Sequence, residues 1–268
     1  MPARIVALPF ALAFLLLLYL NFETGGQYAF YLIPVLASLA VIYVFSPQID
    51  WWWYQRHPPE LAGTIRELLF KFPFYQRLPE GEKKKFRQRV ALFVMGNNFI
   101  PQIIETVPED VKAIVAANAV TLTFGQEKLL FPKFENVIIN PKPLPTLQYP
   151  DKYHTSEIYE PDGAVLFSIE QLVRSFVESS QYFNIGLYEY AKAFAISYPN
   201  YVYPTFDENS WEALERISGF SKEWITQWIN LPDIDPLAVS MAHFFTFPAQ
   251  FRKELPAAFE AYRGIFKM

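Results

Sequence analysis

The chain of 268 residues contains no cysteine, which excludes disulfide bonds, a cysteine nucleophile and cysteine ligands to zinc. This composition is compatible with a reducing compartment but does not require one. Histidine is scarce too, because His57, His154 and His243 are the only three in the sequence. A metal site based on histidine therefore has few positions to draw on.

Glycine motifs and positive charge are also limited. Gly125 and Gly186 stand alone, so the sequence has no phosphate-binding loop. Ser168, Ser179 and Ser180 lie outside any G-x-S-x-G pattern, which gives serine hydrolase chemistry no support. A net charge of −4 argues against a nucleic-acid-binding surface.

Apolar residues, in contrast, are abundant and concentrated near the N-terminus. Residues 5–19 and 28–45 are nearly uncharged, and at about 1.5 Å per helical residue each covers most of a hydrocarbon core of about 30 Å. A short polar turn at residues 23–27 separates them. The pattern predicts a two-helix transmembrane hairpin over residues 1–47. A cleavable signal peptide is the alternative for the first run, but no small-x-small site follows that run before Asn21.

Residues 48–64 are predicted to be a juxtamembrane linker. Their three consecutive tryptophans at 51–53 suit the headgroup zone of a bilayer. Arg4 and Arg56 flank the hairpin, whereas its turn carries only Glu23, so the positive-inside rule places both ends in the cytoplasm. The basic run at 83–85 is interpreted as a solvated helix face, or alternatively as a contact with anionic lipid.

Residues 65–268 are predicted to form one mostly helical α+β domain with a small mixed sheet. The order of the elements shows no βαβ alternation. Aromatic residues such as Tyr198, Tyr201, Tyr203 and Phe206 are interpreted as core, with a groove for a peptide as the alternative. Periodicity and punctuation predict strands at 136–139 and 163–167, and helices at 60–74, 82–94, 109–122, 169–179, 182–197, 210–216, 221–229, 236–245 and 256–266.

The predicted helix at 182–197 contains an altered metallopeptidase pattern. An H-E-x-x-H helix places two histidines four residues apart on one face, with a glutamate between them as general base. Here Tyr188 and Lys192 occupy the histidine positions, and Glu189 is retained. By itself this pattern carries little information, so its meaning depends on the rest of the chain.

The chain resembles the MtfA-type zinc metallopeptidases, a gluzincin-like family. The resemblance covers residues from about 65 to the C-terminus and rests on short segments in a shared order, including AANAVTLTFG at 116–125 and GAVLFS at 163–168. It implies a zincin-like fold. The remaining segments are residues 72–75, 86–90, 109–112, 138–141, 153–157, 237–239 and 243–245.

This resemblance assigns roles to individual positions. It implies Glu189 as the general base and Tyr188 and Lys192 at the two histidine ligand positions. Asp235 falls at the third ligand position, which is normally a glutamate, and Ala242 replaces a further acidic residue. We therefore expect no resident metal or other cofactor.

The resemblance also implies an edge strand for an extended substrate. The strand at 163–168, with Gly163, Val165 and Phe167, is expected to be that edge. His154 and Glu157 match a family segment ahead of this strand and are expected to order a loop. His243 follows Asp235 by about two helical turns, so a relocated metal site from Asp235, His243 and Glu189 is an alternative.

Chemistry argues against zinc at the altered positions. Removing the protons of a tyrosine and a lysine at pH 7 costs about 4 and about 4.6 kcal/mol before any metal bond forms. We therefore expect the ammonium of Lys192 to replace the cation, lying between Glu189 and Asp235. The simpler interpretation is a surface Lys–Glu pair that contributes well under about 1 kcal/mol.

The sequence thus predicts a membrane-anchored, catalytically inactive MtfA-like homologue that binds a protein or peptide or regulates one. Its expected partners are the lipid bilayer and a peptide segment, and nucleic acid is excluded. One alternative is an active zinc peptidase with unorthodox ligands, in which Glu189 activates water. Another is a membrane-tethered structural protein whose cleft is closed by side chains.

Overall fold

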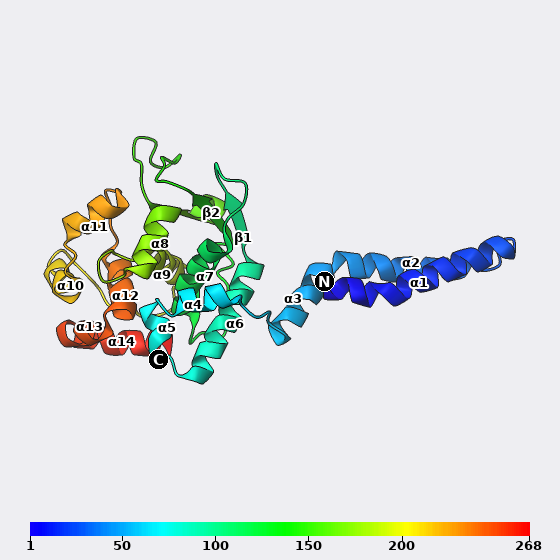
Figure 1. Ribbon diagram of the computed structural model, residues 1–268, viewed down its shortest axis with the longest axis horizontal. Coiled ribbons are helices and arrows are strands. Elements are labelled where there is room, and N and C mark those ends of the chain that lie inside the picture. Colours follow the sequence, from blue (N-terminus) through cyan, green and yellow to red (C-terminus); the bar gives the residue numbers. More distant parts are fainter. The chain divides into compact units, whose positions relative to one another are not determined.

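The computed structural model describes residues Met1–Met268, and the chain forms two compact units (Figure 1). The first unit, Met1–Pro59, contains α1 (Pro2–Glu23), α2 (Ala29–Val44) and α3 (Ser46–Arg56). The second unit, Glu60–Met268, contains all other elements.

Helix α1 is long and apolar enough to cross a membrane. It has 22 residues, its most apolar stretch has a mean hydropathy of 2.4, and none of that stretch is buried. At about 1.5 Å per residue the helix extends about 33 Å, which matches a hydrocarbon core. Gly25 and Gly26 reverse the chain with φ of 65° and 105°, values that glycine adopts readily. Helix α2 then packs beside α1 (Figure 1).

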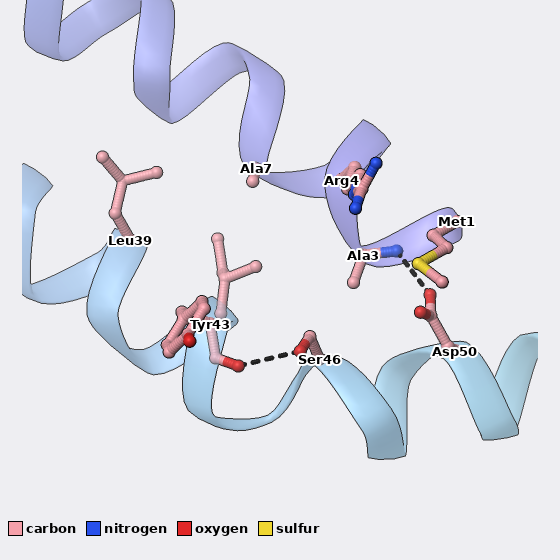
Figure 2. A pocket seen from close by; sticks show the side chains of 9 residues that line it. Met1, Ala3, Arg4, Ala7, Leu39, Tyr43, Ser46 and Asp50 are labelled. Carbon is pink, nitrogen blue, oxygen red and sulfur yellow. Dashed lines mark hydrogen bonds between the residues drawn. The ribbon is translucent and has the colours of Figure 1, made fainter.

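Helices α2 and α3 meet at Phe45 with a bend of 60°, and only the bent pair together is long enough to form a second span. Part of the predicted linker at 48–64 is therefore helical and belongs to the first unit. The side chain of Asp50 on α3 accepts a hydrogen bond from the backbone N–H of Ala3 at 2.8 Å, which ties α3 to the start of α1 (Figure 2).

The second unit contains one mixed sheet of four strands. These are β1 (Asn98–Pro101), β2 (Asn136–Asn140), β3 (Ser156–Tyr159) and β4 (Ala164–Ser168), in the spatial order β1-β2-β4-β3. β1, β2 and β4 are parallel, and β3 pairs with β4 in the antiparallel direction. The expected small mixed sheet is therefore present.

The prediction that Gly163, Val165 and Phe167 form an edge strand is wrong. β4 is an inner strand, because Val165 pairs with Val137 of β2 and with Ile158 of β3. Gly163 precedes the strand, with a left-handed φ of 57°. β3 and β1 are the edges, and both were missed because they are short and lack a run of β-branched residues.

Helix α9 (Ile185–Ser197) packs against the sheet at β3, α7 (Glu109–Thr123) packs on α9, and α6 (Glu80–Gly96) packs on α7. Val165 and Phe167 face these helices, and the ring of Tyr190 on α9 lies 6.1 Å from Phe167 and 5.8 Å from Phe93 on α6. α7 is apolar on nearly all sides and is buried throughout, as expected for a central helix.

The other helices surround this core. The helix predicted at 60–74 is divided, because Pro73 begins a new helix and disfavours helical backbone before it. α13 was not predicted. The remaining elements are α4 (Gly63–Leu69), α5 (Pro73–Arg77), the short η1 (Glu160–Asp162), α8 (Ile169–Val177), α10 (Ser210–Ser218), α11 (Lys222–Ile229), α12 (Pro236–Thr246), α13 (Pro248–Glu254) and α14 (Pro256–Phe266).

Candidate functional site

Helix α9 carries the altered motif and is fixed at its N-terminus by two local features. The side chain of Asn184 caps the helix by accepting the N–H of Leu187 at 2.9 Å. Gly186 lies against Asn118 of α7, and a Cβ at Gly186 would come within 2.3 Å of Asn118 Nδ2. The glycine thus allows α9 to approach α7 closely and sets the position of the motif residues that follow.

Glu189 is completely buried, and both of its carboxylate oxygens face neighbouring groups. Ser156 at the start of β3 donates its hydroxyl to Oε1 at 2.8 Å. The ammonium of Lys192 lies 2.5 Å from Oε2 and forms an ion pair with it, although outside hydrogen-bonding geometry. Glu189 therefore links α9 to β3 through Ser156. Its counter-ion is Lys192, which lies one turn further along the same helix.

Lys192 interacts with two residues of its own helix and makes no ion pair or hydrogen bond with α12. Besides the ion pair, its ammonium lies 4.7 Å from the centre of the Tyr188 ring, a cation–π arrangement. No ion pair joins it to Asp235, so the predicted bridge between Glu189 and Asp235 is wrong. The simpler surface-pair interpretation fails too, because the side chain of Lys192 is only 18% exposed and that of Glu189 is fully buried.

The carboxylate of Asp235 serves instead as the N-cap of α12. Its Oδ1 accepts the N–H of Leu237 at 2.8 Å, and this local bond explains why the carboxylate does not reach Lys192. The backbone N–H of Asp235 donates to the hydroxyl of Tyr188 at 3.1 Å. The two positions are thus joined by a neutral hydrogen bond.

The Tyr188 side chain is buried and remains a phenol. Burial first, and then the neighbouring carboxylate of Glu189, raises its pKa well above the usual value for tyrosine. Its ring packs edge-on against Phe183 at 5.6 Å. The side chain therefore fills space at the first ligand position and offers no phenolate.

His154 and Glu157 pair with each other beside this cluster. His154 Nε2 lies 2.9 Å from Glu157 Oε2, and both side chains are buried. The Nδ1 nitrogen lies 3.0 Å from the carbonyl of Lys152, which can only accept, so Nδ1 carries a proton. The backbone of His154 pairs with Leu144 in both directions at 3.3 Å. The pair therefore fastens the loop between β2 and β3.

His243 lies apart from these residues, on α12. Its ring is buried between Phe183 and Phe247, and neither ring nitrogen has a hydrogen-bond partner. Burial lowers its pKa to about 3, so the ring is neutral. The alternative metal site from Asp235, His243 and Glu189 does not form, because no three His, Asp or Glu side chains converge.

Comparison with known proteins assigns the chain to a family. Residues 50–195, more than half of the chain, match the sequence pattern of the glucose-regulated metallo-peptidase M90 family. The chain belongs to this family. The matched segment includes β1 to β4 and nearly all of α9, and it ends before Asp235.

One relative shows how far the similarity extends. An uncharacterised protein of Synechocystis sp. is 25% identical over 136 residues, which are 49% of this chain and 45% of the relative. The match thus spans less than half of that protein's length. The resemblance to MtfA-type metallopeptidases is confirmed at the level of the M90 family.

The residues that the resemblance places at the ligand positions do not fit a zinc ion. Tyr188 is a phenol whose pKa is raised by burial, so it offers no phenolate to a metal, and an ammonium at Lys192 can only donate. The Asp235 carboxylate accepts from its own helix. Tyr188, Lys192 and Asp235 therefore do not form a set of zinc ligands.

Two residues of this M90 site were missed in the sequence. Ser156 holds Glu189, and Phe183 packs against Tyr188. Ser156 stands next to Glu157 in a segment that the family resemblance had already marked. Its role depends on the unrecognised strand β3, whose side-chain alternation points Ser156 toward α9 and Glu157 away from it.

Proposed function

We propose that this chain is an M90-family protein without peptidase activity, in which the ammonium of Lys192 replaces the catalytic metal as the partner of Glu189. The observation that carries this proposal is the separation of 2.5 Å between Lys192 Nζ and Glu189 Oε2. One charge of the pair is fully buried, so removing its partner is costly. The lysine thus acts as part of the fold.

Glu189 is unsuited to act as general base in this arrangement. A general base must reach the proton that it removes, either directly or through one water. Glu189 has no exposed surface, and its two oxygens face Ser156 and Lys192. Peptide hydrolysis at this glutamate would first require both contacts to break.

The same domain offers an edge where an extended peptide can bind without being cut. In β3, the backbone of Glu157 and Tyr159 faces β4, so the N–H and C=O groups of the partly exposed Ile158 point away from the sheet, whereas Ser156 is buried. A partner strand would add to β3 beside α9. β1 is a poorer edge, because Pro101 lacks an N–H.

We further propose that the first unit anchors the protein in a membrane. The apolar surface of α1 supports one span, and the bent pair α2–α3 is proposed as the second. Arg4 and Arg56 favour the cytoplasm for both ends of this unit, and therefore for the domain that follows. The proposed protein is thus a two-pass membrane protein with a cytoplasmic binding domain.

The test uses the full chain in detergent or nanodiscs and a library of unstructured peptides, read out both for cleavage and for retention. We expect retention of a subset of peptides with no cleavage. Ile158→Pro removes the outward N–H and leaves the pairing with β4 intact, so it should abolish retention. Ile158→Thr keeps the N–H and is the matched control, which should bind like the original chain.

Each outcome discriminates between alternatives. Zinc-dependent cleavage that is lost in Glu189→Gln would overturn the inactive assignment. Peptide retention that is equal in Ile158→Pro and Ile158→Thr would exclude β3 as the binding edge. If the original chain retains no peptide, the result would favour a membrane-tethered structural protein. In that protein the cleft is closed by side chains such as Tyr188.

A further inference from the structure

A cavity of about 440 Å³ lies between the start of α1 and the junction of α2 with α3. Figure 2 shows that its two walls come from these helices, with Arg4 on α1 and Asp50 on α3. Ala7 and Leu39 are among its apolar lining residues. The cavity therefore combines two charged side chains with an apolar wall.

The bend between α2 and α3 explains why this space is not filled by protein. α2 packs along α1, but the chain turns by 60° at Phe45, so α3 leaves the direction of α2 and contacts α1 where the N–H of Ala3 donates to Asp50. The facing residues Ala3 and Ala7 are too small to fill the gap. Only the bond from Ala3 N–H to Asp50 crosses it.

Two charged groups in this cavity lack a complete set of partners. The guanidinium of Arg4 makes no hydrogen bond or ion pair within the chain, in contrast to Arg56, which donates to the carbonyl of Trp52 and stacks over its ring at 3.9 Å. Asp50 uses Oδ1 to accept from Ala3, while its second oxygen has no partner. One cation and one anion thus remain available on opposite walls.

We propose that this cavity binds one phospholipid with a primary ammonium in its headgroup, of the phosphatidylethanolamine type. The phosphate would meet Arg4, the ammonium would meet the free oxygen of Asp50, and an acyl chain would lie against Leu39 and Ile42. This inference rests on the proposed membrane anchoring.

The chemistry of the cavity favours this lipid over others. The free carboxylate oxygen of Asp50 calls for an ammonium, which phosphatidylglycerol lacks, so the cavity matches a headgroup with a primary ammonium better than an anionic headgroup without one. A quaternary ammonium has no N–H to donate to Asp50, which disfavours phosphatidylcholine. The apolar wall requires an acyl chain, so a free phosphate or a water-soluble headgroup does not satisfy the site. Trp52 and Trp53, two and three residues after Asp50, suit the level of the headgroups.

The test is native mass spectrometry of the full chain released from nanodiscs that contain phosphatidylethanolamine, phosphatidylglycerol and phosphatidylcholine in equal amounts. We expect one phosphatidylethanolamine to be retained in preference to the others. Arg4→Gln should lower this retention about tenfold, as expected for loss of one charge-assisted bond. Arg56→Gln removes the same charge at the same end of the hairpin and should have no effect. Asp50→Asn still accepts from Ala3 but should lose the preference over phosphatidylcholine.

Equal retention in Arg4→Gln and Arg56→Gln, or equal retention of all three lipids by the original chain, would overturn the proposed site. Glycerophosphoethanolamine, which lacks acyl chains, should not compete; effective competition would also overturn it. An alkaline wash of membranes separates the two levels of the proposal. Release of the original chain by the wash would contradict the anchoring itself, whereas a chain that resists the wash but retains no lipid would contradict only the site.

Discussion

The backbone N–H of Asp235 donates a hydrogen bond to the hydroxyl of Tyr188 at 3.1 Å and so joins α12 to α9. In an M90 peptidase these two positions would be connected through the metal, according to the resemblance described above. Here a neutral phenol makes the connection. The relationship gives a structural role to a residue that is unsuited to bind zinc.

The hydroxyl of Tyr188 is therefore expected to stabilise the fold. Tyr188→Phe should lower the free energy of unfolding by about 1 kcal/mol, because the buried N–H of Asp235 loses its acceptor. Tyr190→Phe is the matched control, since the Tyr190 hydroxyl is buried without a partner and its removal should cost nothing. Denaturant unfolding followed by tryptophan fluorescence measures both. Equal losses in the two variants would show that the bond to Asp235 contributes nothing.

Lys192 should be essential for stability because it neutralises a buried carboxylate. Lys192→Met is expected to lower the free energy of unfolding by about 3–5 kcal/mol, the usual cost of leaving one buried charge unpaired. Adding Glu189→Gln to that variant should restore most of the loss. Chelators should not change the unfolding midpoint of the original chain.

The Lys83–Glu80 pair provides the control for this cycle. It has the same i, i+3 spacing and a separation of 2.9 Å, but Glu80 is 83% exposed. Lys83→Met should therefore change the unfolding free energy far less than Lys192→Met does. A small effect at both lysines would mean that Lys192 forms an ordinary surface pair.

Long, strongly patterned elements could be predicted from the sequence. α7 follows Pro108 and opens with two acidic residues, α9 is capped by Asn184, and both are long apolar segments, so their positions follow from local chemistry. β3 could not be predicted, because its four residues form a strand only through pairing with β4. The family resemblance placed the edge at residues 163–168, and because β3 was not recognised, nothing in the sequence corrected that expectation.

His243 should make the fold sensitive to acid. Its pKa is lowered to about 3 by burial, whereas an unfolded histidine titrates near 6.5, so the unfolded state binds the proton first as pH falls. Below about pH 6.5 this one group should remove about 1.4 kcal/mol of stability per pH unit. His243→Leu is expected to reduce the slope of unfolding free energy between pH 6 and pH 4, measured by urea titrations, by about one proton. An unchanged slope would refute the assignment.

His154 should have the opposite dependence. Burial lowers its pKa, but the hydrogen bonds to Glu157 and to the Lys152 carbonyl outweigh that effect and raise the pKa overall. Its contribution is therefore fully present below the unfolded pKa of about 6.5 and is lost as pH rises through the folded pKa. Relative to His154→Gln, the original chain should lose stability over the alkaline range that begins near pH 6.5. A constant difference between the two proteins over that range would argue against the pair.

The roles within the site were harder to predict than the elements. The motif spacing brought Glu189 and Lys192 together, since residues three apart on a helix are neighbours. The role predicted for Asp235 rested on the family resemblance alone. In the structure its carboxylate accepts a hydrogen bond from the N–H of Leu237, two residues further along the chain. Short-range bonds of this kind compete with a tertiary partner, and sequence spacing does not reveal which one wins.

The central claim is that a lysine stands where the family holds its metal, and zinc content tests it most directly. Purified full-length protein, incubated with zinc and desalted, should retain far less than stoichiometric metal, whereas Tyr188→His combined with Lys192→His should gain it. Stoichiometric zinc in the original chain that disappears in Glu189→Gln would contradict the account.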